Sequence, residues 1–295
     1  MVSYCPVNQL SYPYFLLIVV VSPQFRIHIM SCKQNHPFRL GTSSYIIPAD
    51  ILANIEYLKD KVDDVELVLF ESDEISNLPT ADDIFRLKEI SSQENLTYSI
   101  HLPLDAYLGS DNGTVRERSV EKCRKIIELT QALEPSAFVM HAEAGPDVNV
   151  NMFSRSEKER FAQCFHESLD ALFSSFALHP SLFCVETLNY PLTILDDVIA
   201  SIGLSVTLDI GHLELYGYSV EDHLRGYLDR TRVFHLHGTC DGKDHRGLEH
   251  TRPVILDMIM KALSDNQDTS RVVTMEVFSE EDFQSSCREM MRFVG

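Results

Sequence analysis

The strongest constraint on the fold is a regular alternation of two hydrophobic periods from residue 38 onward. Short runs of apolar and β-branched residues, typical of buried strands, alternate with longer amphipathic stretches, typical of helices. The runs lie at residues 38–41, 65–70, 96–101, 137–141, 182–186, 206–209, 233–236 and 272–276. Eight strand and helix units within roughly 250 residues predict a single (β/α)8 barrel, an α/β fold with a closed parallel sheet.

Two features refine this fold prediction. Hydroxyl residues followed three positions later by a carboxylate predict helix starts at Thr114, Ser154, Ser219 and Ser279. An open doubly wound sheet is the alternative fold. However, residues 40–45 after the first run read Leu-Gly-Thr-Ser-Ser-Tyr, without the Gly-x-Gly-x-x-Gly turn that such a sheet usually carries.

The first 37 residues differ from the rest in composition, with two basic residues and no acidic ones. Their apolar run, 15–21, is shorter than the ~20 residues of a membrane helix. The run also lacks the basic start and small-residue cleavage site of a signal peptide. We therefore predict a disordered or artefactual extension at 1–37 and a barrel domain at 38–295.

The overall composition limits the partners and the compartment. With 25 Lys and Arg against 44 Asp and Glu, the formal net charge is −19. Binding to duplex nucleic acid or to an anionic membrane depends on basic residues, so neither is expected. The seven cysteines are scattered, without a Cys-x-x-Cys pair, which favours reduced thiols in the cytoplasm.

Six successive predicted strands finish on a His, Asp or Glu. These residues are His101, His141, Glu186, Asp209, His235 and Glu276. The strand ends of a closed barrel meet on one ring, where several carboxylates would repel each other unless a cation held them. A mixture of imidazoles and carboxylates suits Zn²⁺ or Mn²⁺ better than Ca²⁺. We therefore predict a divalent metal site, with one to three ions per chain.

Three further histidines lie close to these strand ends. Gly211 allows the chain to turn so that His212 can reach the same centre as Asp209. His237 shares a strand face with His235, and His245 follows in the next loop.

These residues resemble the xylose-isomerase-like barrels, which include endonuclease IV and many sugar epimerases. The most specific stretch is Leu-Asp-Ile-Gly-His at 208–212, followed by Tyr-Gly-Tyr at 216–218. The resemblance to the nucleases implies metal ligands at His101, His141, Glu186, Asp209, His212, His235, His245 and Glu276. Lys243 stands where the nucleases have a ligand Asp, which departs from a complete three-metal set. The resemblance to the epimerases implies one metal, held by Glu186, Asp209, His235 and Glu276.

Segments 40–48, 62–71, 100–105 and 231–238 resemble the cobamide-remodelling phosphodiesterases. This resemblance implies hydrolysis of the phosphodiester in the nucleotide loop of a vitamin B12-type corrinoid. The catalytic residues would be Glu186, Glu276 and His237, and the substrate contacts would be Tyr45, Asp105, Asn189 and Tyr190. Glu66 and Glu71 are expected either to support the site or to form ordinary ion pairs.

Two other functions remain open at this stage. One is a single-metal isomerase or epimerase of a sugar or sugar phosphate, in which the two glutamates move a proton on and off carbon. The other is a corrinoid-binding barrel without catalysis. The sequence sets neither the metal, the exact substrate nor the oligomeric state.

Overall fold

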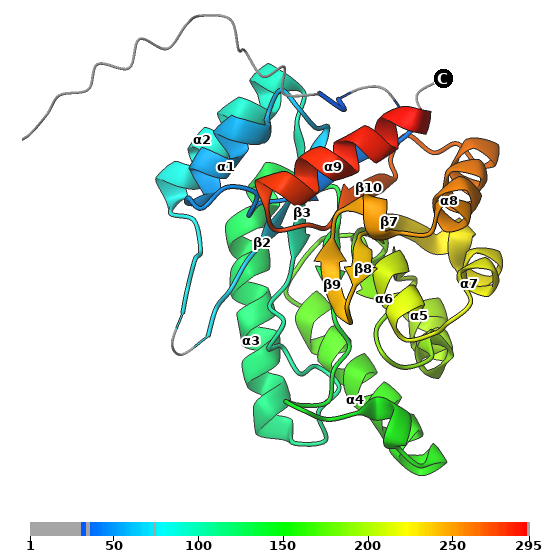
Figure 1. The fold of residues 1–295 in the computed structure, drawn as a ribbon. Helices are drawn as coiled ribbons and strands as arrows, with labels where there is room; N and C mark the ends of the chain where they lie inside the picture. The colour runs from blue at the N-terminus through cyan, green and yellow to red at the C-terminus, as the bar shows by residue number, and fades with distance from the viewer. Residues whose placement is uncertain (1–30, 34–35, 73–74, 294–295) are drawn as a thin grey trace, which may run out of the picture.

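A computed structural model describes residues 31–33, 36–72 and 75–293 (Figure 1). Eight parallel strands close into a barrel in the order β1-β10-β7-β6-β5-β4-β3-β2, which confirms the predicted fold. The barrel strands are β1 (Arg39–Ser43), β2 (Asp64–Val68), β3 (Thr97–His101), β4 (Phe138–Met140), β5 (Phe183–Glu186), β6 (Ser205–Asp209), β7 (Thr231–Leu236) and β10 (Val272–Met275).

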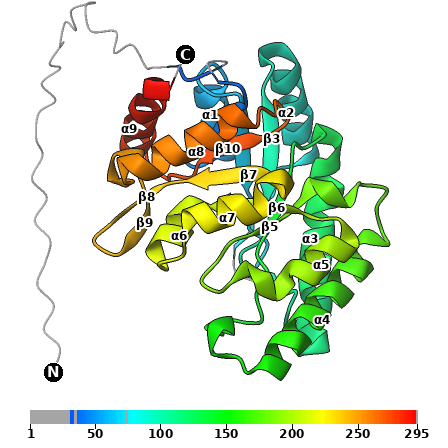
Figure 2. The same cartoon turned by 90° about the vertical axis from the view of Figure 1, so that its right-hand side faces the viewer.

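Helices surround the barrel on its outside (Figures 1 and 2). They are α1 (Ile51–Leu58), α2 (Ala81–Glu94), α3 (Gly113–Thr130), α4 (Arg155–Phe173), α5 (Asp196–Ile202), α6 (Ile210–Leu215), α7 (Val220–Tyr227), α8 (Pro253–Asp265) and α9 (Glu280–Met290). Each barrel strand is therefore followed by at least one helix before the next barrel strand begins.

Alternate residues of each strand face opposite sides of the barrel wall. On β4, Phe138 and Met140 join the large hydrophobic core beneath the helices. Val139 instead belongs to a small separate cluster with residues such as Cys184 and Val233, which fills the barrel interior. The inward series continues from Val139 to His141 and from Cys184 to Glu186, so the period of two aims these polar residues into the barrel mouth.

The helix starts follow local capping chemistry, with one correction. Ser154 caps α4 through a reciprocal box with Glu157, as predicted. The predicted start at Thr114 is wrong, because Asn112 caps α3 and accepts hydrogen bonds from the backbone N–H groups of Thr114 and Val115. The Asn112 side chain therefore caps the first turn of α3 two residues before the position expected from Thr114.

Three residues of the predicted N-terminal extension contact the barrel. Cys32 is fully buried in the main hydrophobic core, and its backbone N–H donates to the Lys61 carbonyl at 2.8 Å. The Lys33 ammonium donates to the carbonyls of Lys59 and Glu94. Residues 31–33 thus pack on the barrel although their composition placed them in the extension. Residues 1–30 and 34–35 of that extension lie outside the described residues.

A short antiparallel hairpin, β8 (Gly238–Cys240) and β9 (Lys243–Arg246), follows β7. Asp241 and Gly242 at its tip both have positive φ, 52° and 72°. Such values suit a tight hairpin turn, for which Asp-Gly is a favoured pair. The segment predicted as a loop is thus a hairpin, which gives His245 a defined position beside the barrel mouth.

Within the described ranges, no helix is both long and apolar enough to cross a membrane.

Candidate metal centre

The predicted strand-end residues converge at the carboxyl end of the barrel. Asp209 and His235 lie directly opposite each other in the β6 and β7 register. Side-chain atoms of Glu186 come within 3.2 to 3.6 Å of four imidazoles, those of His101, His141, His212 and His235. Residues separated by up to 175 positions in the sequence, as His101 and Glu276 are, therefore share one site because neighbouring strands end at similar heights.

Within the described part of the chain, the side chains form three groups that could each hold a metal ion. In each group, one ligand atom per residue lies within 4.8 Å of the corresponding atoms of the others. The groups are His101, His141 and Glu186; Glu186, Asp209, His235 and Glu276; and His212, His237 and His245. All eight predicted ligands occur among them, and His237 is added.

The group of Glu186, Asp209, His235 and Glu276 presents the clearest set of free ligand atoms. His235 Nδ1 and Glu276 Oε2 are buried, lie 3.2 Å apart and have no hydrogen-bond partner among the residues that the structure describes. Buried polar atoms without partners are rare in proteins. Two such atoms facing one space, beside two further carboxylates, fit a divalent cation with N and O ligands.

The group of His101, His141 and Glu186 brings two imidazoles to the same carboxylate oxygen. His101 Nδ1 lies 2.8 Å from the Leu102 carbonyl, so the ring donates there and its Nε2 atom faces Glu186 at 3.4 Å. His141 contacts Glu186 through Nε2 and Glu143 through Nδ1, at 3.2 and 3.5 Å. Glu143 is a supporting carboxylate that sequence reasoning missed. Its spacing of two from His141, just beyond the strand, was the available signal.

In the group of His212, His237 and His245, the His237 ring packs directly against Gly211. A Cβ atom on Gly211 would lie 2.0 Å from the His237 ring, so only glycine leaves room for the imidazole. The structure thus gives Gly211 a different role from the predicted turn, and it places His237 beside two predicted ligands. His237 Nε2 lies 3.1 Å from Asp209 Oδ1, and its Nδ1 accepts from the backbone N–H of His245 at 3.0 Å. Both nitrogens of His237 therefore have protein partners, whereas Nδ1 of His235 has none among the described residues.

The Gly211 contact leads to a stability prediction. We expect Gly211→Ala to displace the His237 ring and to lower the free energy of unfolding by about 1–3 kcal/mol, as overpacking typically does. Urea denaturation measures this change. Gly226 on α7 is the matched control, because a Cβ there would contact nothing within 4 Å in the described part of the chain. Gly226→Ala should be neutral or stabilising by up to about 1 kcal/mol, and equal effects of the two substitutions would contradict the prediction.

Opposite charges balance one another among the side chains of the site. Burial disfavours the charged imidazolium of His141, but Glu186 and Glu143 outweigh it and raise its pKa to about 9. Burial opposes protonation of His212 as well, yet Asp209 and Glu186 raise its pKa to about 10. Burial likewise works against ionisation of Glu276, but His235 and His245 lower its pKa to about 2. Protons on the imidazoles thus balance the buried carboxylates, and a bound cation would replace them.

Glu66 on β2 contacts the Nε2 atom of the His235 imidazole. It is fully buried, and its Oε2 lies 3.0 Å from His235 Nε2. A hydrogen bond donated by Nε2 to this carboxylate orients the ring so that Nδ1 faces the metal group, where it is the atom that would bind a cation. Glu71, by contrast, is ion-paired with Lys125. Glu66 therefore contacts a residue of the site, whereas Glu71 forms an ordinary ion pair. These are the two roles that the sequence left open.

We expect Glu66→Gln to weaken zinc binding by about 10- to 100-fold, because the amide keeps the shape but removes the charge behind His235. Competition with a chromogenic chelator measures the affinity. Glu71→Gln is the control and should leave zinc affinity unchanged. Equal zinc affinity in the Glu66→Gln variant and the unsubstituted protein would show that the contact does not support a metal ligand.

The predicted substrate contacts are spread around the barrel mouth. Tyr45 is half-buried beside Phe70, and Asp105 is ion-paired with Lys122. The backbone carbonyl of Asn189 accepts from the Tyr218 hydroxyl at 3.2 Å. Tyr190 is buried, and its hydroxyl donates to the Ala142 carbonyl at 2.6 Å, so that hydroxyl supports the loop after β4.

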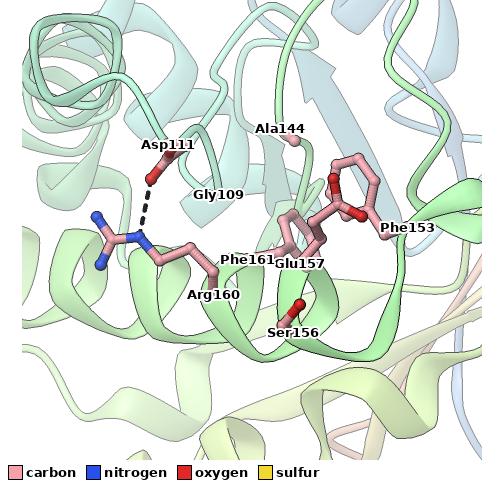
Figure 3. Close-up of a pocket in the computed structure, with 8 residues that line it drawn as sticks. All are labelled: Gly109, Asp111, Ala144, Phe153, Ser156, Glu157, Arg160 and Phe161. Carbon is pink, nitrogen blue, oxygen red and sulfur yellow. Dashed lines mark hydrogen bonds and ion pairs between the residues drawn. The ribbon is translucent and has the colours of Figure 1, made fainter.

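A separate cavity of about 250 Å³ lies between the start of α4 and the loop before α3 (Figure 3). Its charged side chains already have partners: Arg160 pairs with Asp111 at 2.8 Å, and Glu157 accepts from the Ser154 backbone N–H. No predicted site residue lines this cavity. The convergence of ligands at the barrel mouth therefore defines the candidate site.

The fold and these groups define a TIM barrel with potential metal ligands at the carboxyl ends of its strands. The family described as xylose isomerase-like TIM barrel matches residues 58–293, and the chain belongs to this family. This finding confirms the family resemblance of the sequence. No curated protein matches the chain significantly by sequence.

Solved structures share the fold at low sequence identity. A D-tagatose 3-epimerase-like protein is 18% identical with a TM-score of 0.68, covering 86% of this chain and 96% of its own. Endonuclease IV from Thermus thermophilus is also 18% identical, with a TM-score of 0.63 and coverage of 86% and 98%. The IOLI protein, solved with a zinc atom, is 13% identical, with a TM-score of 0.64 and coverage of 87% and 98%. Since epimerases and a nuclease share this fold, the activity must be argued from the site.

Proposed function

We propose that the protein is a metal-dependent phosphodiesterase acting on a small-molecule substrate. The observation that carries the proposal is the position of Glu186, which belongs to two ligand groups at once. Its Oε2 faces His101 and His141, whereas its Oε1 faces His212 and His235. A carboxylate with one oxygen toward each group is suited to bridge two cations.

Paired divalent cations, when bound, supply Lewis acidity at phosphate oxygens and make water more acidic. The chain's own residues then have distinct tasks. Glu186 and Asp209 hold the positive charge in place, and Glu276 is placed to accept the proton of the attacking water. The Glu276 side chain is only 7% exposed and lies beside His235 and His245, so bulk water has limited access to the carboxylate.

The proposed substrate is the nucleotide loop of a vitamin B12-type corrinoid, hydrolysed during cobamide remodelling. The sequence segments around β1, β2, β3 and β7 support this choice through their resemblance to cobamide-remodelling phosphodiesterases. The net charge of −19 also favours a small molecule over duplex DNA, because the chain has a deficit of basic residues for contacting many phosphates. Cytoplasmic location, which reduced cysteines favour, belongs to the same proposal.

We expect protein loaded with zinc or manganese to hydrolyse adenosylcobalamin. Water adds to phosphorus, the bond from phosphorus to the ribose oxygen breaks, and the products are a phosphorylated cobinamide and the lower-ligand riboside. Mass spectrometry detects both products. Metal-stripped protein is the control, and intact adenosylcobalamin after incubation with metal-loaded protein would contradict this substrate assignment.

A single-metal sugar isomerase or epimerase is the second candidate. The observation that favours it is the group of Glu186, Asp209, His235 and Glu276, which could hold one ion without the other groups. The two glutamates of this group, Glu186 and Glu276, could also move a proton between substrate carbons. About one metal per chain, together with solvent deuterium entering a ketose and no diester cleavage, would support this candidate instead.

A further inference from the structure

An apolar groove borders the candidate metal centre. It has a volume of about 520 Å³ and is lined mainly by Tyr45, Ile47, Pro48, Phe70 and Phe278. These residues come from the loops after β1, β2 and β10, three neighbouring strands of the barrel. The groove therefore opens at the same end of the barrel as the metal ligands.

Phe278 connects the groove to the metal centre. Its ring packs edge-on against the imidazole of His245, with 5.1 Å between ring centroids, and it follows Glu276 by two residues. Phe278 remains 42% exposed although it is large and apolar. An exposed aromatic ring beside potential metal ligands is a ready contact surface for a bound molecule.

The polar groups that line the groove are already used within the protein. The Tyr45 hydroxyl accepts from the Asn77 amide. The Ser279 hydroxyl donates to the Asp282 carboxylate at 2.6 Å, and Glu280 accepts from the Tyr57 hydroxyl at 2.9 Å. A sugar with many hydroxyls would find few free partners here, whereas a flat apolar ring needs none.

The loop that forms one wall is held in place by Asn54. This side chain is fully buried, and it accepts from the backbone N–H groups of Ile46 and Ile47 at 2.8 and 2.9 Å. Its amide also donates to the carbonyls of Ile47 and Ala49. A wall fixed in this way is formed before a ligand arrives, which reduces the ordering cost of binding.

We propose that this groove binds an aromatic ring carried on one arm of the substrate while the phosphate of that substrate lies at the metal centre. The position of the phosphate rests on the proposed function, but recognition of the ring does not depend on which bond is broken. A volume of about 520 Å³ falls within the range of about 300–1,000 Å³ that small-molecule pockets occupy. A site that recognises an aromatic ring in this way differs in its substrate contacts from a site that selects a free sugar.

The test measures binding of phosphonates, which cannot be hydrolysed as esters, to the zinc-loaded full chain by calorimetry. Phenylalkyl phosphonates with linkers of increasing length are compared with alkyl phosphonates of the same linker. For at least one linker, we expect the phenyl compound to bind about tenfold more tightly. Phe278→Ala should remove most of that preference. Ile47→Ala, on a different loop, should reduce it by about threefold, as loss of a smaller apolar contact would.

Phe85→Ala is the matched control, because Phe85 is 66% exposed on α2 and does not line the groove. It should keep the full preference. Equal binding of both series to unsubstituted protein, no binding of either, or an unchanged preference in both groove variants would overturn the proposal. A dimer that Phe278→Ala dissociates, without any ring preference, would overturn it in favour of a second copy of the chain. A ring preference without diester hydrolysis would contradict only the proposed function.

Discussion

Glu186→Gln is expected to reduce phosphodiester hydrolysis by at least about a thousandfold while the barrel stays folded. The carboxylate faces four imidazoles, and its two oxygens face different ligand groups. Glutamine preserves the side-chain shape but removes the negative charge and offers one oxygen in place of two. Both metal positions should therefore weaken together, and effects of this size are typical of losing electrostatic stabilisation at a catalytic centre.

Two measurements distinguish this result from unfolding. Metal analysis should show fewer ions per chain in Glu186→Gln, while the circular dichroism spectrum should remain that of the unsubstituted protein. Glu167→Gln is the control, because Glu167 pairs with Arg116 on the outside of the barrel. It should retain full activity and metal content. Unchanged turnover in Glu186→Gln would rule out the proposed bridging role.

Zinc is expected to stabilise the protein more strongly as the pH rises from 6.5 toward about 9. In the metal-free protein, the raised pKa values of His141 and His212 mean that both imidazoles stay protonated at neutral pH. Their contribution to stability is fully present below about pH 6.5 and is lost as the pH rises through about 9 and 10. Zinc must displace such protons, so its affinity should increase by about tenfold per pH unit for each proton released.

Thermal unfolding of zinc-loaded and metal-stripped protein across this pH range measures the effect. Where free zinc reaches a thousand times its dissociation constant, stabilisation is about 4 kcal/mol, or on the order of 10 °C for a domain of this size. The difference in Tm between the two forms should widen toward alkaline pH. A difference that stays constant or narrows would show that the imidazoles do not exchange protons for the metal.

The sequence alone determined the fold and most of the candidate ligands. Eight apolar runs separated by amphipathic stretches are explained economically by a barrel, because each run must be buried on both faces. The period of two along each strand then fixes which residues face inward. For that reason His101, Glu186 and Glu276 could be assigned to one centre although they lie far apart in the chain.

Contacts between separate elements were decided only by the tertiary structure. His237, which follows β7, packs its ring into the space beside Gly211 on α6. The Glu66 side chain on β2 contacts His235 on β7. Burial of Cys32 depends on packing against the barrel, which composition does not reveal. Strand periodicity gives the face of each residue but not its neighbours across the barrel. The neighbours depend on how the closed sheet is staggered, and they decide which carboxylate each imidazole meets.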